Sequence, residues 1–193
     1  MARLAPHPLP ADVHPATPDL AYARVNLDDP ATTVMTDLRR YRAVTIRGQE
    51  TLAAAERLMI DAGVRLLLVI NAAGAIIGVA TYRDLTGERS LAAAAHERIA
   101  HADLAVALVM TPADKVKTLD YRAVTHTPVR DLIEFLRTEG RQHALVTETD
   151  ESGRPVVRGI FSITQVGRLL GIPIEADERA QSFAEIEHLL AHG

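Results

Sequence analysis

The chain has 193 residues and a formal net charge of −4, with 48% hydrophobic and 24% charged residues, which is an ordinary globular balance. The acidic balance argues against a general nucleic-acid binder, which usually has a basic face and a high pI, and the lack of cysteine excludes disulfides and thiolate sites. No apolar run approaches the roughly 18 residues that span a bilayer, so we expect no membrane partner and a place in the cytoplasm.

The first 28 residues form a proline-rich segment that we predict to be a tail on the surface. Proline has a fixed φ and no amide donor, which disfavours regular structure here. The prolines of this segment are Pro6, Pro8, Pro10, Pro15 and Pro18. We therefore place residues 1–28 outside the folded core.

A first series of elements is predicted after this tail. A short helix carries Val34-Met35-Thr36, and residues 43–46 are extended. Apolar residues at helical spacing predict a helix between Thr51, a good side-chain cap, and Gly63, which enters the left-handed conformation without a Cβ clash. Two strands and a last helix are predicted at 65–70, at 75–81 and from about residue 82.

The same order of elements recurs in the second half of the chain. The predicted elements there are a short helix at 109–111, an extended stretch at 123–127, a helix from Thr127-Pro128 to Gly140, strands at 144–149 and 156–162, and a helix near 164–166. Five segments match in order at offsets of about 75 to 81 residues: 34–36 with 109–111, 43–45 with 123–125, 58–63 with 135–140, 66–69 with 143–146, and 77–81 with 158–162. The chain is therefore predicted to be a duplication.

Neither unit of roughly 50–60 residues buries much surface alone. We therefore expect an α/β (α+β) protein in which two pseudo-symmetric β-α-β-β-α repeats pack sheet-to-sheet into one globular module. The expected segments are the tail 1–28, a first domain with its linker helix at 29–100, a second domain at 101–173, and a C-terminal amphipathic helix at 174–193. That last helix either packs on its own chain or lies across a dimer partner.

The chain resembles the tandem CBS-domain (cystathionine beta-synthase domain pair) proteins over roughly residues 30–173. The marks of that family are a Met-Thr element before the first strand, a helix ending in Gly, a hydrophobic strand and a Gly-hydrophobic-x-Ser/Thr-x-x-Asp motif. The segment Gly78-Val79-Ala80-Thr81-Tyr82-Arg83-Asp84 fits this last motif at every position. The second copy, residues 159–165, keeps the Gly and the hydroxyl but has Gln165 in place of the acid.

The resemblance implies a regulatory sensor module with up to two clefts for an adenosyl ligand: AMP, ADP, ATP or S-adenosylmethionine. It also implies a homodimer and a regulated partner protein outside the chain. In the family the motif acid binds the ribose hydroxyls, and the Ser/Thr hydroxyl lies near the ribose or phosphate. Carried over by position, the first cleft is lined by Thr45, Ile46, Val64, Arg65, Thr81 and Asp84, and the second by Thr125, Arg141, His143 and Ser162. Gln165 leaves ribose binding in the second cleft open.

The residues of the first motif suit this chemistry, although a simpler account exists. A carboxylate accepts two hydrogen bonds and so chelates a vicinal diol, and a glycine lets backbone and ligand approach closely. Thr81 and Asp84, three residues apart at a strand-to-helix junction, also resemble a capping box. The two roles are compatible, and both stay open at this point.

Two further candidates have plain alternatives. Arg65 is either a phosphate ligand or a solvated surface charge. His143 is either a buried, hydrogen-bonded core histidine or a group that makes the second site sensitive to pH near neutrality.

Nothing in the sequence points to catalysis or to a metal. The eight histidines show no metal-binding spacing, and there is no Gly-x-Ser-x-Gly elbow or phosphate-binding Gly-x-x-x-x-Gly-Lys. We therefore expect no enzyme activity, no catalytic cofactor and no metal ligand. The alternative to a ligand sensor is an interaction or scaffold dimer that kept the fold and lost ligand binding.

Overall fold

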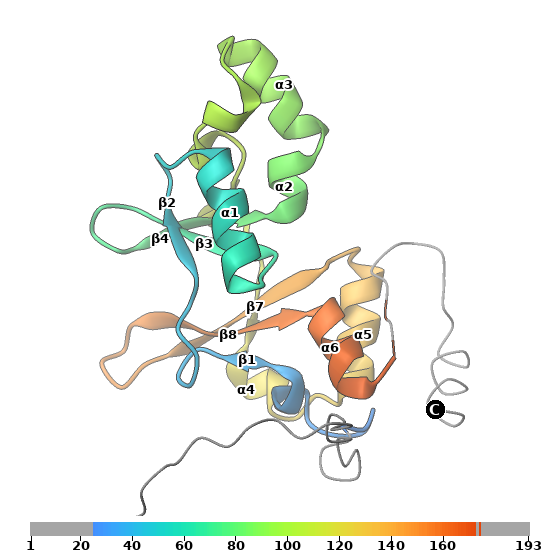
Figure 1. The fold of residues 1–193 in the computed structure, drawn as a ribbon. Helices are drawn as coiled ribbons and strands as arrows, with labels where there is room; N and C mark the ends of the chain where they lie inside the picture. The colour runs from blue at the N-terminus through green and yellow to red at the C-terminus, as the bar shows by residue number, and fades with distance from the viewer. Residues whose placement is uncertain (1–24, 173, 175–193) are drawn as a thin grey trace, which may run out of the picture.

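The computed structural model describes residues 25–172 and 174, in which each repeat supplies most of one four-stranded sheet (Figure 1). The first sheet has the order β2 (Thr45–Arg47), β3 (Leu66–Ile70), β4 (Ile76–Thr81), β5 (Thr111–Pro112). The second has the order β6 (Thr118–Asp120), β7 (His143–Thr149), β8 (Pro155–Ser162), β1 (Thr36–Asp37). In each sheet the first pair is parallel and the other pairs are antiparallel.

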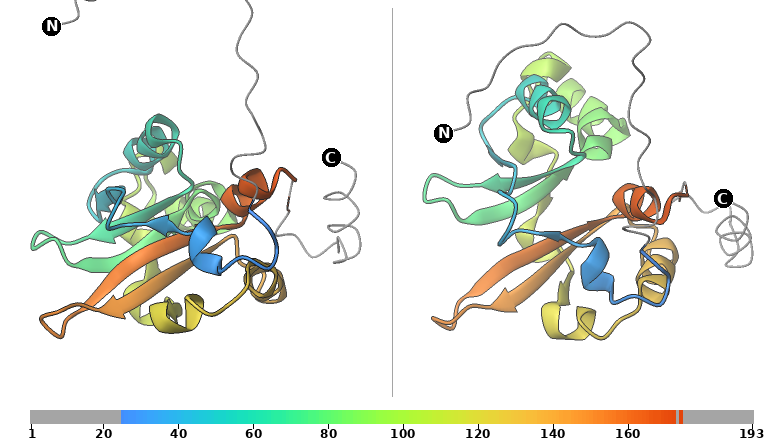
Figure 2. Two further views of the ribbon diagram at one scale, coloured as in Figure 1. Left: turned by 90° about the horizontal axis from the view of Figure 1, so that it is seen from below. Right: turned by 60° about the horizontal axis from the view of Figure 1, so that its bottom comes forward.

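The two sheets lie between two groups of helices (Figure 1). The first group is α1 (Leu52–Ala62), α2 (Tyr82–Thr86) and α3 (Glu88–Glu97); the second is α4 (Tyr121–Val124), α5 (Val129–Thr138) and α6 (Ile163–Leu170). Short 3₁₀ helices connect them: η2 (Ala31–Val34), η3 (His101–Asp103), η4 (Val106–Leu108) and η5 (Ala113–Lys115). The turns of the β3–β4 and β7–β8 hairpins point to the same side of the molecule (Figure 2).

Local signals set the ends of the longest helix of the first repeat. Thr51 accepts a hydrogen bond from the Ala54 amide at 3.2 Å, which satisfies one of the free donors of the first turn of α1. Gly63 ends the helix at φ +64°, in the left-handed region that glycine tolerates best. Both ends are therefore as predicted.

The hydrophobic core has three parts. One lies between the first sheet and its helices and includes Leu52, Met59 and Leu67. A second lies between the second sheet and α5 and α6, around Ile133 and Phe161. The third lies between the two sheets and joins Leu66, Leu68 and Val79 of the first repeat to Leu145 of the second. The predicted fold, two repeats packed sheet-to-sheet into one module, is confirmed.

Each Met-Thr element joins the sheet of the other repeat. β1 pairs with β8, and β5 pairs with β4. A Cβ built on Gly78 would lie 2.8 Å from the Met110 sulfur and 2.5 Å from the Thr111 carbonyl oxygen. A Cβ on Gly159 would overlap the Met35 side chain in the same way. Each motif glycine therefore makes room for the methionine of the other repeat's Met-Thr element: Met110 at Gly78 and Met35 at Gly159. The sequence had suggested that these glycines make room for a ligand.

Some expectations about individual elements are wrong, and others lie outside the described residues. The segments 34–36 and 109–111 are not short helices, since strands β1 and β5 begin at Thr36 and Thr111. The stretch 123–127 is not extended, because α4 occupies residues 121–124. The first strand of the second repeat is β6, which ends at Asp120. Asp120 causes the change: its side chain caps α4 by accepting from the amides of Arg122 at 2.8 Å and Ala123 at 3.2 Å.

The tail expected at residues 1–28 and the C-terminal helix expected at 174–193 lie mostly outside the described residues. The end of that tail is not outside the core as expected, because Leu27 is buried in the second core and Val25 packs against it.

Candidate functional site

The first repeat's motif lies where β4 passes into α2. Thr81 is the N-cap of α2, and its hydroxyl oxygen accepts from the Asp84 amide at 3.3 Å. Asp84 Oδ2 accepts from the Thr81 amide at 2.9 Å and from the Thr81 hydroxyl at 2.7 Å. The capping interpretation of this pair is thus confirmed. All of these bonds to the carboxylate use Oδ2, and Oδ1 receives no hydrogen bond from the described residues.

A cleft of about 300 Å³ opens beside this pair, between the two repeats. The first repeat contributes Thr81, Arg83 and Asp84 together with the apolar side chains of Leu66 and Val79. The other wall comes from the Met-Thr strand, from residues 115–117 and from residues 140–145. A ligand in this cleft would therefore touch both repeats at once.

The structure regroups the residues that the sequence assigned to two clefts. Arg141 and His143, expected in the second cleft, line the same cleft as Thr81 and Asp84. The reason is the sheet-to-sheet packing, which brings the start of β7 opposite the end of β4 through the contacts of Leu66, Val79 and Leu145. The first motif is thus faced by side chains of the second repeat.

The remaining predicted residues do not line this cleft. Ile46 is buried in the first core, and Val64 packs against the same core. Thr45 and Arg65 are exposed. Thr125 ends α4, where its hydroxyl donates to the Arg122 carbonyl at 2.7 Å. Its assignment followed from matching Ala123–Thr125 to the first strand, and the true counterpart of β2 is β6.

Three basic or polar groups of the cleft were missed in the sequence. Lys115 and Lys117 flank Val116 in the segment between η5 and β6, and Gln142 precedes β7. Arg141 is held against this segment, because its Nη1 lies 3.5 Å from the Lys117 carbonyl oxygen and its Nε 3.7 Å from Glu139 Oε2. A better alignment of β6 would have placed Lys115 and Lys117 just before the first strand of the second repeat, next to the cleft.

The lining of the cleft carries an excess of positive charge, although Asp114 lies 3.8 Å from Lys115 Nζ and Glu139 lies 3.7 Å from Arg141 Nε just outside it. Arg83, Lys115, Lys117 and Arg141 line it, and Asp84 is its one lining carboxylate. The chain as a whole carries a net charge of −4, so this local field is opposite in sign to the overall charge. The arrangement suits an anionic ligand with hydroxyl groups.

His143 is half-buried in the lining of this cleft, without the hydrogen bond expected for a core histidine. Its Nδ1 is inaccessible and has no partner among the described residues. Burial and, to a smaller extent, the charge of Arg65 together lower the pKa of His143 to about 4. The ring is therefore neutral near pH 7.

The second repeat's motif is built differently from the first. Ser162 is the N-cap of α6 but makes no side-chain cap hydrogen bond. Gln165 stands where Asp84 stands in the first repeat, so no carboxylate reaches back to the backbone. This copy lacks both the reciprocal cap and the charged acceptor.

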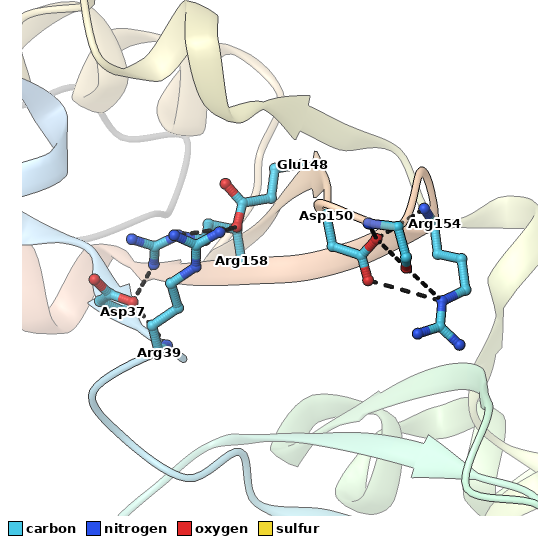
Figure 3. Close-up of polar contacts among 7 residues, drawn as sticks. Asp37, Arg39, Glu148, Asp150, Arg154 and Arg158 are labelled. Atoms are coloured by element: carbon cyan, nitrogen blue, oxygen red, sulfur yellow. Dashed lines mark hydrogen bonds and ion pairs between the residues drawn. The ribbon is translucent and has the colours of Figure 1, made fainter.

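A polar network unforeseen in the sequence lies toward the opposite end of β7 (Figure 3). The Arg158 guanidinium donates to Asp37, lies 3.2 Å from Glu148 Oε1 and stacks 4.7 Å from the Tyr121 ring centroid. Arg39 pairs with the same Glu148 oxygen at 2.6 Å. The hydrogen bond from Arg158 is the main cause of a lowered pKa at Asp37. The network fastens β1 to the sheet of the second repeat.

The described residues contain neither a metal-binding cluster nor a membrane-spanning helix. No group of three or more histidine, cysteine, aspartate or glutamate side chains is placed to hold a metal ion there. Within the same residues, no helix has the length and apolar character needed to cross a membrane.

Comparison with known proteins gives a family match and many structural matches. The CBS domain family model matches residues 31–90. No curated protein matches the chain. An uncharacterized conserved protein from Pyrococcus horikoshii has 20% identity and a TM-score of 0.54, covering 78% of this chain and 98% of its own.

Two further structures are similar to the chain. A CBS-domain containing protein from Agrobacterium tumefaciens has 23% identity and a TM-score of 0.51, covering 72% of this chain and 91% of its own. A candidate signal-transduction protein with CBS domains from Burkholderia ambifaria has 18% identity and a TM-score of 0.50, covering 73% and 88%. At these identities the likeness is one of fold.

Proposed function

Because residues 31–90 match the CBS domain family model and the fold is that of CBS-domain proteins, we propose that the chain is a regulatory module that binds an adenosyl ligand in the cleft between its two repeats. The observation that carries the proposal is the cleft of about 300 Å³ beside Thr81 and Asp84, walled by both repeats. The candidate ligands are AMP, ADP, ATP and S-adenosylmethionine.

The lining of the cleft supports this ligand class. Asp84 Oδ1 receives no hydrogen bond from the described residues, so it is able to accept from a ribose hydroxyl while Oδ2 keeps the cap. Apolar side chains from both repeats, Leu66, Val79 and Val116, offer surfaces for a flat base. Polar and apolar groups thus lie within one cavity, as an adenosyl group requires.

Regulation follows from the position of the cleft. A ligand shifts a conformational equilibrium only by its difference in affinity for the two states. Contacts to both walls make such a difference available, since any change in how the sheets pack alters the cleft. We propose that the output passes to a separate partner protein and that the chain binds its ligand without transforming it.

We further propose that the chain acts as a homodimer. The outer helices of the first repeat carry exposed apolar side chains, with Ile60 of α1 at 70% exposure and Leu91 of α3 at 57%. Burial of these side chains against a second copy would be favourable.

A thermal-shift panel tests ligand binding. AMP, ADP, ATP and S-adenosylmethionine are added to the wild type, to Asp84→Ala and, as the matched control in the second motif, to Gln165→Ala. At 100 times its Kd a ligand adds about 2.7 kcal/mol, which is roughly 5–10 °C for a protein of this size. We expect such a shift for at least one ligand in the wild type and in Gln165→Ala.

The variant Asp84→Ala should lose the shift. Each variant is compared with its own unliganded Tm, because removing the cap by itself lowers the stability of Asp84→Ala. A flat response to the whole panel by folded wild-type protein would refute the proposal and favour the scaffold alternative.

A further inference from the structure

We propose that the cleft selects an adenosine polyphosphate, ADP or ATP, over S-adenosylmethionine, and that Lys115, Lys117 and Arg141 bind its phosphates. This inference rests on the proposed function, since it names the ligand class of the same cleft. The observation behind it is the set of four cationic side chains that line one cavity with a single carboxylate.

The charge of the cleft separates the candidate ligands. ATP and ADP are polyanions, whereas S-adenosylmethionine carries a sulfonium, an ammonium and one carboxylate and is cationic overall. Placing a cation among four cations costs free energy through like-charge repulsion, and placing a polyanion there gains it.

The positions of the cations assign the phosphate end. Asp84 belongs to the first-repeat wall, while Lys115, Lys117 and Arg141 belong to the second-repeat wall. Arg141 is anchored by its contacts at 3.5 Å to the Lys117 carbonyl oxygen and at 3.7 Å to Glu139 Oε2. A ribose held at Asp84 therefore directs its 5′ substituent across the cleft toward an organised group of donors.

The matching positions of the first repeat do not repeat this chemistry. Counting back from β2 as from β6, the counterparts of Lys115 and Lys117 are Arg42 and Val44. Counting from β3 as from β7, the counterpart of Arg141 is Val64. Within the described residues, the cations and the carboxylate thus occur together in one cleft, and we expect one polyphosphate per chain.

Isothermal titration calorimetry of the full chain, without divalent cations, tests the proposal. The ligands are adenosine, AMP, ADP, ATP and S-adenosylmethionine. We expect affinity to rise with phosphate number and ATP to bind at least tenfold more tightly than S-adenosylmethionine. In the double variant Lys115→Ala/Lys117→Ala, ATP should bind at least tenfold more weakly, while adenosine binding changes by less than threefold.

A charge-matched control separates local contacts from the general field. The double variant Arg57→Ala/Arg122→Ala removes the same charge at exposed positions outside the cleft and should leave ATP affinity within threefold of the wild type. Equal losses in the two double variants would overturn the assignment of the phosphates to Lys115 and Lys117.

The remaining outcomes distinguish the two proposals. If S-adenosylmethionine or adenosine binds as tightly as ATP, and Asp84→Ala abolishes that binding, the proposed function stands and the polyphosphate inference fails. If no adenosyl ligand binds the folded wild type, both fail together.

Discussion

Ile77 and Arg158 occupy the same place in the two sheets, yet their surroundings differ completely. Each is the extra residue at a bulge just before the motif glycine, between the paired positions of β3 and β4 or of β7 and β8. Ile77 packs against the first hydrophobic core, whereas Arg158 is at the centre of an ion network. The same backbone position in this fold therefore accommodates either an apolar side chain or an ion-paired one.

The two motif ends differ in a second way. The first repeat has a reciprocal cap at Thr81 and Asp84 and faces the cationic wall of the second repeat. In the second repeat, Ser162 has no side-chain cap bond and Gln165 has no charge. Both repeats thus have the same fold, whereas the charged side chains suited to a ligand lie beside the first motif.

The largest expected effect on stability comes from replacing Arg158 at the bulge of β8. Arg158→Ile, which copies the first repeat, removes the partner of two mostly buried carboxylates, whose side chains are 18% exposed at Asp37 and 14% at Glu148. We expect a loss of about 3 kcal/mol in the free energy of unfolding, because the two carboxylates keep only the largely exposed Arg39 and Arg40 as charged partners. Urea unfolding at pH 7 measures it.

A double-mutant cycle sharpens this comparison. In an Asp37→Asn background, Arg158→Ile should cost clearly less, since one of the stranded charges is gone. An equal cost in both backgrounds would mean that Arg158 stabilises through its aliphatic stem and its contact with Tyr121.

The next effect concerns His143, whose counterpart in the first repeat is Leu66. The pKa of His143 falls from 6.5 to about 4 on folding, mainly through burial. Above pH 6.5 the ring is neutral in both states. As the pH falls from 6.5 to 4, the unfolded chain takes up a proton that the folded protein does not, so stability declines.

His143→Leu should remove this decline. Between pH 7 and pH 4.5 we expect the wild type to lose about 2 kcal/mol more than the variant, as measured by urea unfolding at the two pH values. Parallel losses in the two proteins would show that the ring takes up its proton as readily when folded as when unfolded.

Local signals made most of the fold predictable. Thr51, Gly63 and Gly140 act within one or two turns of a helix, so the sequence displays the capping residues directly. Strand β3 and residues 144–146 of β7 are apolar because sheets and helices cover both faces there. Because the chain is a duplication, each of these signals occurs twice. The two similar units indicated that the repeats pack sheet-to-sheet.

What the sequence could not display depends on packing between distant segments. β1 and β5 are two residues long and join the other repeat's sheet, which no local pattern encodes. For the same reason Arg141 and His143 were assigned to the wrong cleft. The prediction of a strand at 123–127 was wrong for another reason. The residues there have an extended-looking pattern, but the side chain of Asp120 caps the first turn of α4 just before them.

The smallest expected effect compares the two motif hydroxyls. Thr81→Ala removes the acceptor for the Asp84 amide and should cost about 1 kcal/mol. Ser162→Ala removes a hydroxyl that caps nothing, so its cost should stay within about 0.5 kcal/mol. Urea unfolding of both variants at pH 7 gives the difference. If Ser162→Ala were the more costly change, the Ser162 hydroxyl would make a stabilising contact other than a helix cap. The two motifs would then differ less in stability than their capping hydrogen bonds indicate.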